Sequence, residues 1–132
     1  MLRDYLIPAL KTAFPEAPFE YSGQGNLVAS LPIPNRIGDL KLCDDGDEIT
    51  VFLGDVTHCH FSQDYLGDGK YSPEPEVCDA VIQDLTDLFS DRVFFYHARD
   101  RGRDGSGPVP LPDELEEIKK DCRCFVWSRA LN

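Results

Sequence analysis

Three strand-like segments joined by two short turns, all within residues 39–61, constrain the fold of this chain more than any other feature. Residues 39–43 and 48–53 flank the acidic sequence Asp-Asp-Gly-Asp, a pattern typical of a β-hairpin. Gly-Asp at 54–55 then predicts a second turn or a bulge, followed by a strand over 56–61. Because hairpins join antiparallel neighbours, we expect an antiparallel sheet here.

The flanking sequence predicts helices that pack on this sheet. Leu2, Leu6 and Leu10 recur at helical spacing, and Pro15 ends the pattern. Ser72 before a proline predicts the capped start of a second amphipathic helix, which continues to about residue 89. The other predicted elements are strands over residues 19–22, 27–33, 92–98 and 123–128, and a short polar helix over 113–120.

These elements predict an α+β fold in a single domain over residues 1–132. We expect one mostly antiparallel sheet of six or seven strands, with the two main helices packed on one face. Residues 99–112 are rich in glycine and proline, which predicts a mobile loop. The sequence contains no internal repeat and no linker that divides it.

The net charge of the chain limits the classes of partner that it can bind. Its 24 acidic and 13 basic side chains give a net charge of −11. Such a field repels nucleic-acid phosphates and attracts cationic partners, so we expect no nucleic-acid binding and favour a basic protein partner. The alternative is that the acidity only keeps the protein soluble.

We expect a cytoplasmic protein without a membrane segment. The N-terminal sequence lacks the pattern of a secretory signal, and no apolar run reaches the thickness of a bilayer. Five cysteines are an odd number, which argues against a disulfide framework. Buried or metal-binding thiols are the expectation instead.

The sequence His58-Cys59-His60 contains the residues best suited to chemistry. Strand alternation places His58 and His60 on one face and Cys59 on the other. Zinc needs three or four ligands, so a zinc site or a metal-dependent hydrolase requires a further ligand such as His97 from another strand. Hydrogen-bonded histidines without a metal explain the same pattern.

The hairpin turn supplies the candidate partner-binding residues. Asp44, Asp45, Asp47 and Glu48 are four carboxylates within five positions, which suits a basic partner. Their spacing does not match a calcium-binding loop. An ordinary solvated turn is the alternative.

Two longer stretches carry a resemblance. The sequence ITVFLGDVTHCHF, followed by a capped helix and then DRVFFYHARDRG, resembles small bacterial cytosolic α+β proteins of uncharacterised or immunity type. The likeness covers roughly residues 48–103. It implies a protein that blocks a partner through an acidic surface, and it assigns no site residue.

Three classes of function therefore compete. The first is a non-enzymatic acidic binding protein, such as an immunity-type inhibitor of a basic toxin or enzyme. The second is a metal-binding module or metal-dependent hydrolase centred on His58 and His60. The third is a scaffold subunit of a homo- or hetero-oligomer. The sequence favours the first, with the acidic turn as its contact surface.

Overall fold

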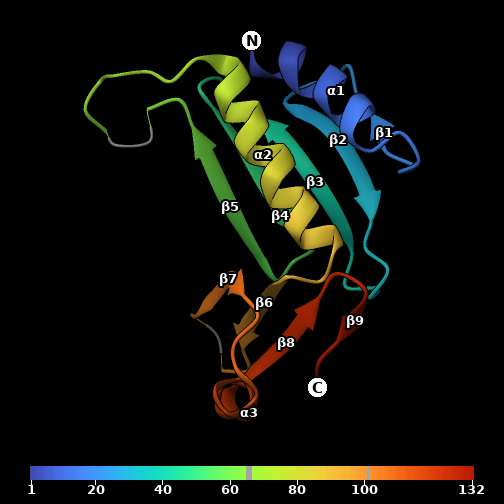
Figure 1. Cartoon of the computed structure of the whole chain (residues 1–132), viewed down its shortest axis with the longest axis vertical. Coiled ribbons are helices and arrows are strands. Elements are labelled where there is room, and N and C mark those ends of the chain that lie inside the picture. The colour runs from blue at the N-terminus through green and yellow to red at the C-terminus, as the bar shows by residue number, and fades with distance from the viewer. Residues whose placement is uncertain (65–66, 101) are drawn as a thin grey trace.

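A computed structural model describes residues 1–64, 67–100 and 102–132. Two antiparallel sheets and three helices make up this described part of the chain (Figure 1). The helices are α1 Leu2–Ala13, α2 Glu74–Phe89 and α3 Pro112–Asp121. The strands are β1 Glu20–Tyr21, β2 Leu27–Pro32, β3 Asp39–Asp44, β4 Glu48–Leu53, β5 Thr57–Ser62, β6 Val93–Ala98, β7 Asp104–Pro108, β8 Cys122–Val126 and β9 Arg129–Ala130.

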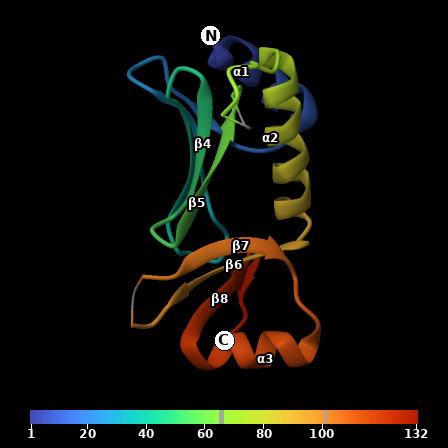
Figure 2. The same ribbon diagram turned by 90° about the vertical axis from the view of Figure 1, so that its left-hand side faces the viewer.

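The large sheet contains β1 to β5 in chain order, so each strand pairs with its sequence neighbour. Helices α1 and α2 lie on one face of it, and no described helix covers the other face (Figure 2). Strand alternation explains this arrangement. In β4, Ile49, Val51 and Leu53 are buried towards the helices, whereas Phe52 points to the open face and is exposed.

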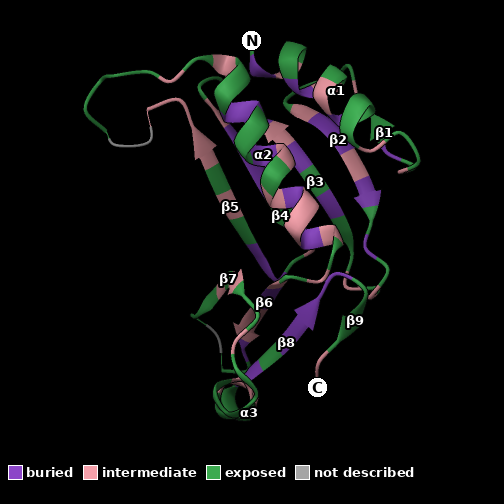
Figure 3. Ribbon diagram, in the orientation of Figure 1, coloured by how far each residue is buried: buried purple, intermediate pink, exposed green. Residues whose placement is uncertain are grey.

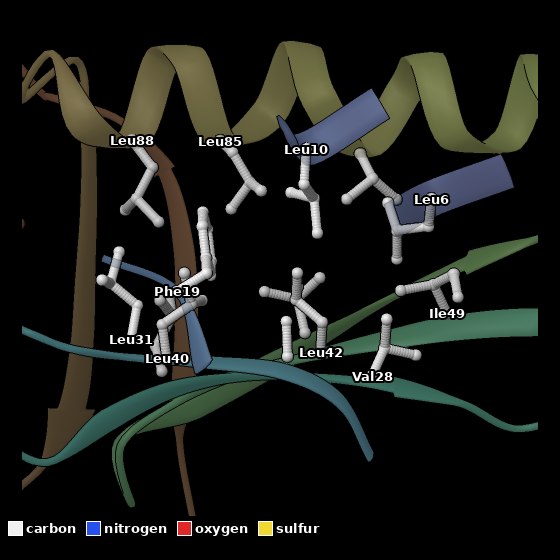
Figure 4. Close-up of a cluster of buried hydrophobic side chains, with 14 of the residues drawn as sticks. Leu6, Leu10, Phe19, Val28, Leu31, Leu40, Leu42, Ile49, Leu85 and Leu88 are labelled. Carbon is white, nitrogen blue, oxygen red and sulfur yellow. The ribbon is translucent and has the colours of Figure 1, made fainter. Parts of the chain in front are cut away.

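The hydrophobic core lies between the large sheet and its two helices (Figures 3 and 4). Leu6 and Leu10 of α1, and Leu85 and Leu88 of α2, point towards the apolar side chains of the sheet. All four leucines are almost completely buried. The helical spacing read from the sequence therefore identified the packed faces correctly.

The small sheet contains β6 to β9, in the order β7-β6-β8-β9. Phe95, Phe125 and Trp127 connect it to the main core. On its other side, Ala98, Cys122 and Cys124 form a second, smaller cluster against α3. Helix α3 contributes only half-buried side chains to that cluster and has no fully buried residue.

The α+β class, the antiparallel pairing and the short helix over 113–120 are confirmed, but the strands do not form the expected single sheet of six or seven. The described residues form nine strands, divided between two sheets, with a third helix on the smaller sheet. Each predicted strand exists, but β6 pairs with β7 and β8 in the small sheet instead of joining the large sheet. Hydrophobic alternation identifies a strand and its buried face, yet carries no information about distant partners.

Two local expectations also change. Residues 99–112, predicted as a loop, contain strand β7, because an edge strand tolerates the glycines and proline of Asp-Gly-Ser-Gly-Pro. Arg101, within that predicted loop, lies outside the described residues. Helix α2 has Pro73 at its N-cap position and no side-chain cap, so Ser72 does not perform the predicted capping.

Across residues 1–64, 67–100 and 102–132, no helix combines the length and apolar character needed to cross a membrane.

Candidate functional site: the acidic turn and strand β5

The first residue of the predicted contact surface, Asp44, is buried. Only 6% of it is exposed, and its carboxylate accepts hydrogen bonds from the backbone N–H of Arg3 (3.0 Å) and of Gly46 (2.9 Å). The N–H of Arg3 belongs to the first turn of α1, where helix N–H groups lack partners within the helix. Asp44 therefore caps α1 and does not belong to the exposed acidic surface.

The neighbouring Asp45 is exposed and held in a defined position. Its carboxylate accepts hydrogen bonds from the hydroxyl of Thr50 (2.6 Å) and the side-chain amide of Asn26 (2.9 Å). These two bonds lower the pKa of Asp45, since they stabilise its ionised form. Asp47 is also exposed, and its backbone carbonyl accepts the N–H of Gln63 (2.8 Å). The turn thus presents two solvent-facing carboxylates, and hydrogen bonds hold that of Asp45 in place.

A hydrogen-bonded cluster connects this turn to strand β5. Nδ1 of His60 lies 3.2 Å from a carboxylate oxygen of Glu48 and 3.1 Å from the hydroxyl of Thr50. A carboxylate only accepts hydrogen bonds, and the Thr50 hydroxyl already donates to Asp45. Nδ1 of His60 must therefore carry the proton, which leaves Nε2 as the ring's other polar atom.

His58 and His60 lie side by side on the open face of the large sheet. Their ring centroids are 5.0 Å apart with an edge-on geometry, and the ring of Phe52 lies 5.6 Å from that of His58. Both histidines are exposed, while Cys59 points towards α2. The predicted alternation along this strand is therefore confirmed.

The predicted third metal ligand, His97, belongs to the small sheet. It pairs with Arg123 on β8 and lines a hollow together with Arg36 and Asp55. Among the described residues, no group of three or more His, Cys, Asp or Glu side chains has a geometry that could hold a metal. His58, His60 and His97 therefore do not converge as a zinc site.

Four of the five cysteines pack in the hydrophobic clusters, and Cys43 is half-buried beside Lys41 and Phe52. All five are free thiols, as their odd number predicts, and Cys78, Cys122 and Cys124 are buried. Burial and the nearby carboxylate of Asp84 raise the pKa of Cys59 to about 12. A thiol with so high a pKa stays protonated near neutral pH, so Cys59 is poorly suited to act as a nucleophile.

The sequence did not identify the position of β5 at the edge of the large sheet. A groove of about 530 Å³ runs beside this strand, lined by His60, Phe61, Ser62, Ser72, Glu76, Val77 and Ala80. The groove lies between strand β5 and the first half of α2. No local signal marked this edge: the segment THCHFS lacks the proline and lysine residues that usually protect edge strands, so its sequence does not distinguish it from an interior strand.

Comparison with protein-family models, with curated proteins and with solved structures finds no significant match to this chain.

Proposed function

We propose that this protein is a non-enzymatic acidic binding protein that holds a basic protein partner. An immunity-type inhibitor of a basic toxin or enzyme is the form that this function would take. The observation that carries the proposal is the turn between β3 and β4, where Asp45 and Asp47 present exposed carboxylates within a chain of net charge −11.

The local bonding of the turn supports this function. The partners of Asp45 are neutral side chains, those of Thr50 and Asn26. Among the described residues, no lysine or arginine forms an ion pair with Asp45, Asp47 or Glu48. Glu48 contacts His60, whereas the carboxylates of Asp45 and Asp47 have no cationic partner among the described residues, so their field extends towards an approaching cation.

The physical role of such a surface is mainly to accelerate and orient association. Complementary charges raise the rate of encounter, whereas buried apolar and aromatic contacts supply most of the affinity. Phe52, on the same sheet, is exposed and can provide such a contact. We therefore expect the turn to control the association rate more than the dissociation rate.

The test is a pair of charge-reversal variants with the same change in net charge. The double variant Asp47→Lys, Glu48→Lys changes the turn, and Asp113→Lys, Glu114→Lys changes α3 on the small sheet. Each is compared with the wild type for association with the basic protein that wild type captures from its host's lysate. At low salt the turn variant should associate about tenfold more slowly or worse, and the difference should shrink at high salt.

The matched variant separates a local interface from overall charge. If both variants slow association equally, net charge alone is responsible and the turn is not the contact surface. If wild type captures no basic protein under low salt, the proposed function is wrong.

A further inference from the structure

The four sheet edges of this protein are protected to different degrees. Strands β1 and β9 are edge strands of only two residues each. Edge strand β7 has the sequence Asp-Gly-Ser-Gly-Pro, in which glycine and proline weaken further pairing. Edge strand β5 has six residues, Thr-His-Cys-His-Phe-Ser, without proline, lysine or glycine. In the described part of the chain, β5 is therefore the one long edge strand without residues that discourage further pairing.

The hydrogen-bond phase of the β4–β5 ladder shows which backbone groups are free. The N–H of Gln63 donates to the carbonyl of Asp47, one position beyond the ladder. Hydrogen-bonded pairs alternate along antiparallel strands, so Phe61 and Cys59 bond to β4, and His60 and His58 direct their N–H and C=O groups away from it. No described residue outside β4 makes a backbone hydrogen bond to either histidine.

The groove beside this edge has the composition that an incoming strand requires. Its floor is apolar, formed by half-buried Phe61, buried Val77 and exposed Ala80. A strand paired with β5 would place alternate side chains over this floor and the others beside His58 and His60.

The charge around the groove is negative. Glu76 lines it, and Glu48 contacts His60 at its border. Asp84 lies close enough to Cys59 of β5 to affect its thiol. Helix α2 carries five acidic side chains and no basic one. An occupant that complements this surface contains lysine or arginine.

We propose that β5 binds an extended basic segment of a partner protein, which adds to the large sheet as a sixth strand and fills the groove against α2. This inference rests on the proposed function for the basic nature of the partner. It adds the place and the mode of binding: main-chain hydrogen bonds to His58 and His60, and apolar contacts with Phe61, Val77 and Ala80.

The first experiment uses a defined peptide, acetylated (Val-Lys)₄ amide, with the full-length protein. Amide hydrogen exchange is measured by NMR at low salt, with and without the peptide. If a strand adds to β5, the N–H groups of His58 and His60 become protected by about tenfold or more, because new hydrogen bonds close over them. Amides of β1, at the opposite edge of the large sheet, serve as the internal control and should not change.

Two further peptides isolate the main-chain contribution, one N-methylated at every valine amide and the other at every lysine amide. N-methylation preserves the side chains and charges but blocks the N–H groups on one side of the strand. One version should lose about tenfold in affinity or more, which corresponds to about 1.4 kcal/mol. Equal affinity for all three peptides would overturn strand addition.

Protein variants provide an independent readout. His60→Pro removes the outward N–H without breaking the β4–β5 ladder, and His60→Ala removes the side chain but keeps that N–H. The proline variant should bind the peptide about tenfold more weakly than the alanine variant. Thermal melting verifies that both are folded; if the proline variant is not, the N-methylated peptides decide the question.

The remaining outcomes separate this inference from the proposed function. Peptide binding without protection of His58 and His60 overturns strand addition but leaves an acidic protein that binds a basic partner. Equal protection by acetylated (Val-Glu)₄ amide overturns the basic character of the segment. Protection that grows with protein concentration alone shows that a second copy occupies the edge, and this also overturns the proposal.

Discussion

The large-sheet and small-sheet regions differ in how their helices are held. Helices α1 and α2 bury three and five side chains respectively against the large sheet, whereas α3 buries none against the small one. The small sheet still contributes Phe95 and Trp127 to the main core. Apolar burial, and therefore most of the stability, is concentrated between the large sheet and its helices, and α3 is the least anchored helix.

The largest expected effect comes from a matched pair of core truncations. Leu85→Ala removes a completely buried side chain of α2 and should lower the free energy of unfolding by about 2–5 kcal/mol. Ile118→Ala removes a half-buried side chain of α3 and should cost about 1 kcal/mol or less. Urea denaturation measures both. Similar losses would show that α3 is as firmly packed as α2.

The second-largest expected loss of stability comes from replacing a glycine in the turn after β4, compared with a glycine in β7 of the small sheet. Gly54 ends the β4 hairpin with a φ of +56°, and a Cβ there would lie 2.5 Å from the carbonyl oxygen of Ile37. Gly54→Ala should therefore destabilise by about 2–3 kcal/mol. Gly107 in β7 has no atom within 4 Å of the same position, so Gly107→Ala should change stability by less than about 0.5 kcal/mol. A large loss at Gly107 would contradict the open space around that position in β7.

Helix capping gives a third, smaller contrast. Asp44→Ala leaves the N–H groups of Arg3 and Gly46 without their acceptor and should cost about 1–2 kcal/mol. The N-cap residue of α3, exposed Leu111, makes no side-chain cap. Leu111→Asp should therefore stabilise α3 by up to about 1 kcal/mol, seen as slower amide exchange in that helix. Asp47→Ala, the control in the same turn as Asp44, should change stability by less than about 0.5 kcal/mol.

The smallest expected effect concerns Asp84, which lies on α2 where that helix approaches β7. Burial, together with the neighbouring Asp87, raises the pKa of Asp84 above 3.8. The folded protein therefore binds this proton more tightly than the unfolded chain, and stability is lost as pH rises through the raised pKa. Asp84→Asn should increase the melting temperature at pH 7, and the gain should disappear as pH falls towards 3.8.

Asp79→Asn on the exposed side of the same helix is the control for Asp84. It changes the net charge equally, so an identical pH-dependent gain would show that the total charge of α2, and not the burial of Asp84, causes the effect.

Local structure could be predicted because its determinants are adjacent in the sequence. The turn after residue 43, the strand-forming segment 48–53 that follows it and the leucine spacing of α1 each identify an element within one or two residues of its observed bounds. The partners of β6 could not be predicted, since strand pairing depends on the relative stability of alternative contacts between distant residues.

The features of the candidate site also fall into those that the sequence predicted and those that it could not predict. Alternation correctly placed His58 and His60 on one face, and composition correctly indicated free cysteines. The burial of Asp44 was not predictable, because its hydrogen-bond donor on Arg3 is 41 residues away. The position of His97 in the second sheet was equally unpredictable, and the alternative hypothesis of a metal site with His97 as a further ligand depended on it.

The sequence by itself determined the helices, all the described strands except β7 and β9, several of the buried faces and the acidic charge, because periodicity and composition are properties of neighbouring residues. The tertiary structure decided which carboxylates of the turn face solvent, which histidines meet and which strand remains at an edge. Those outcomes depend on contacts between segments far apart in the chain, where packing and backbone hydrogen bonding select one arrangement among several that the local pattern permits.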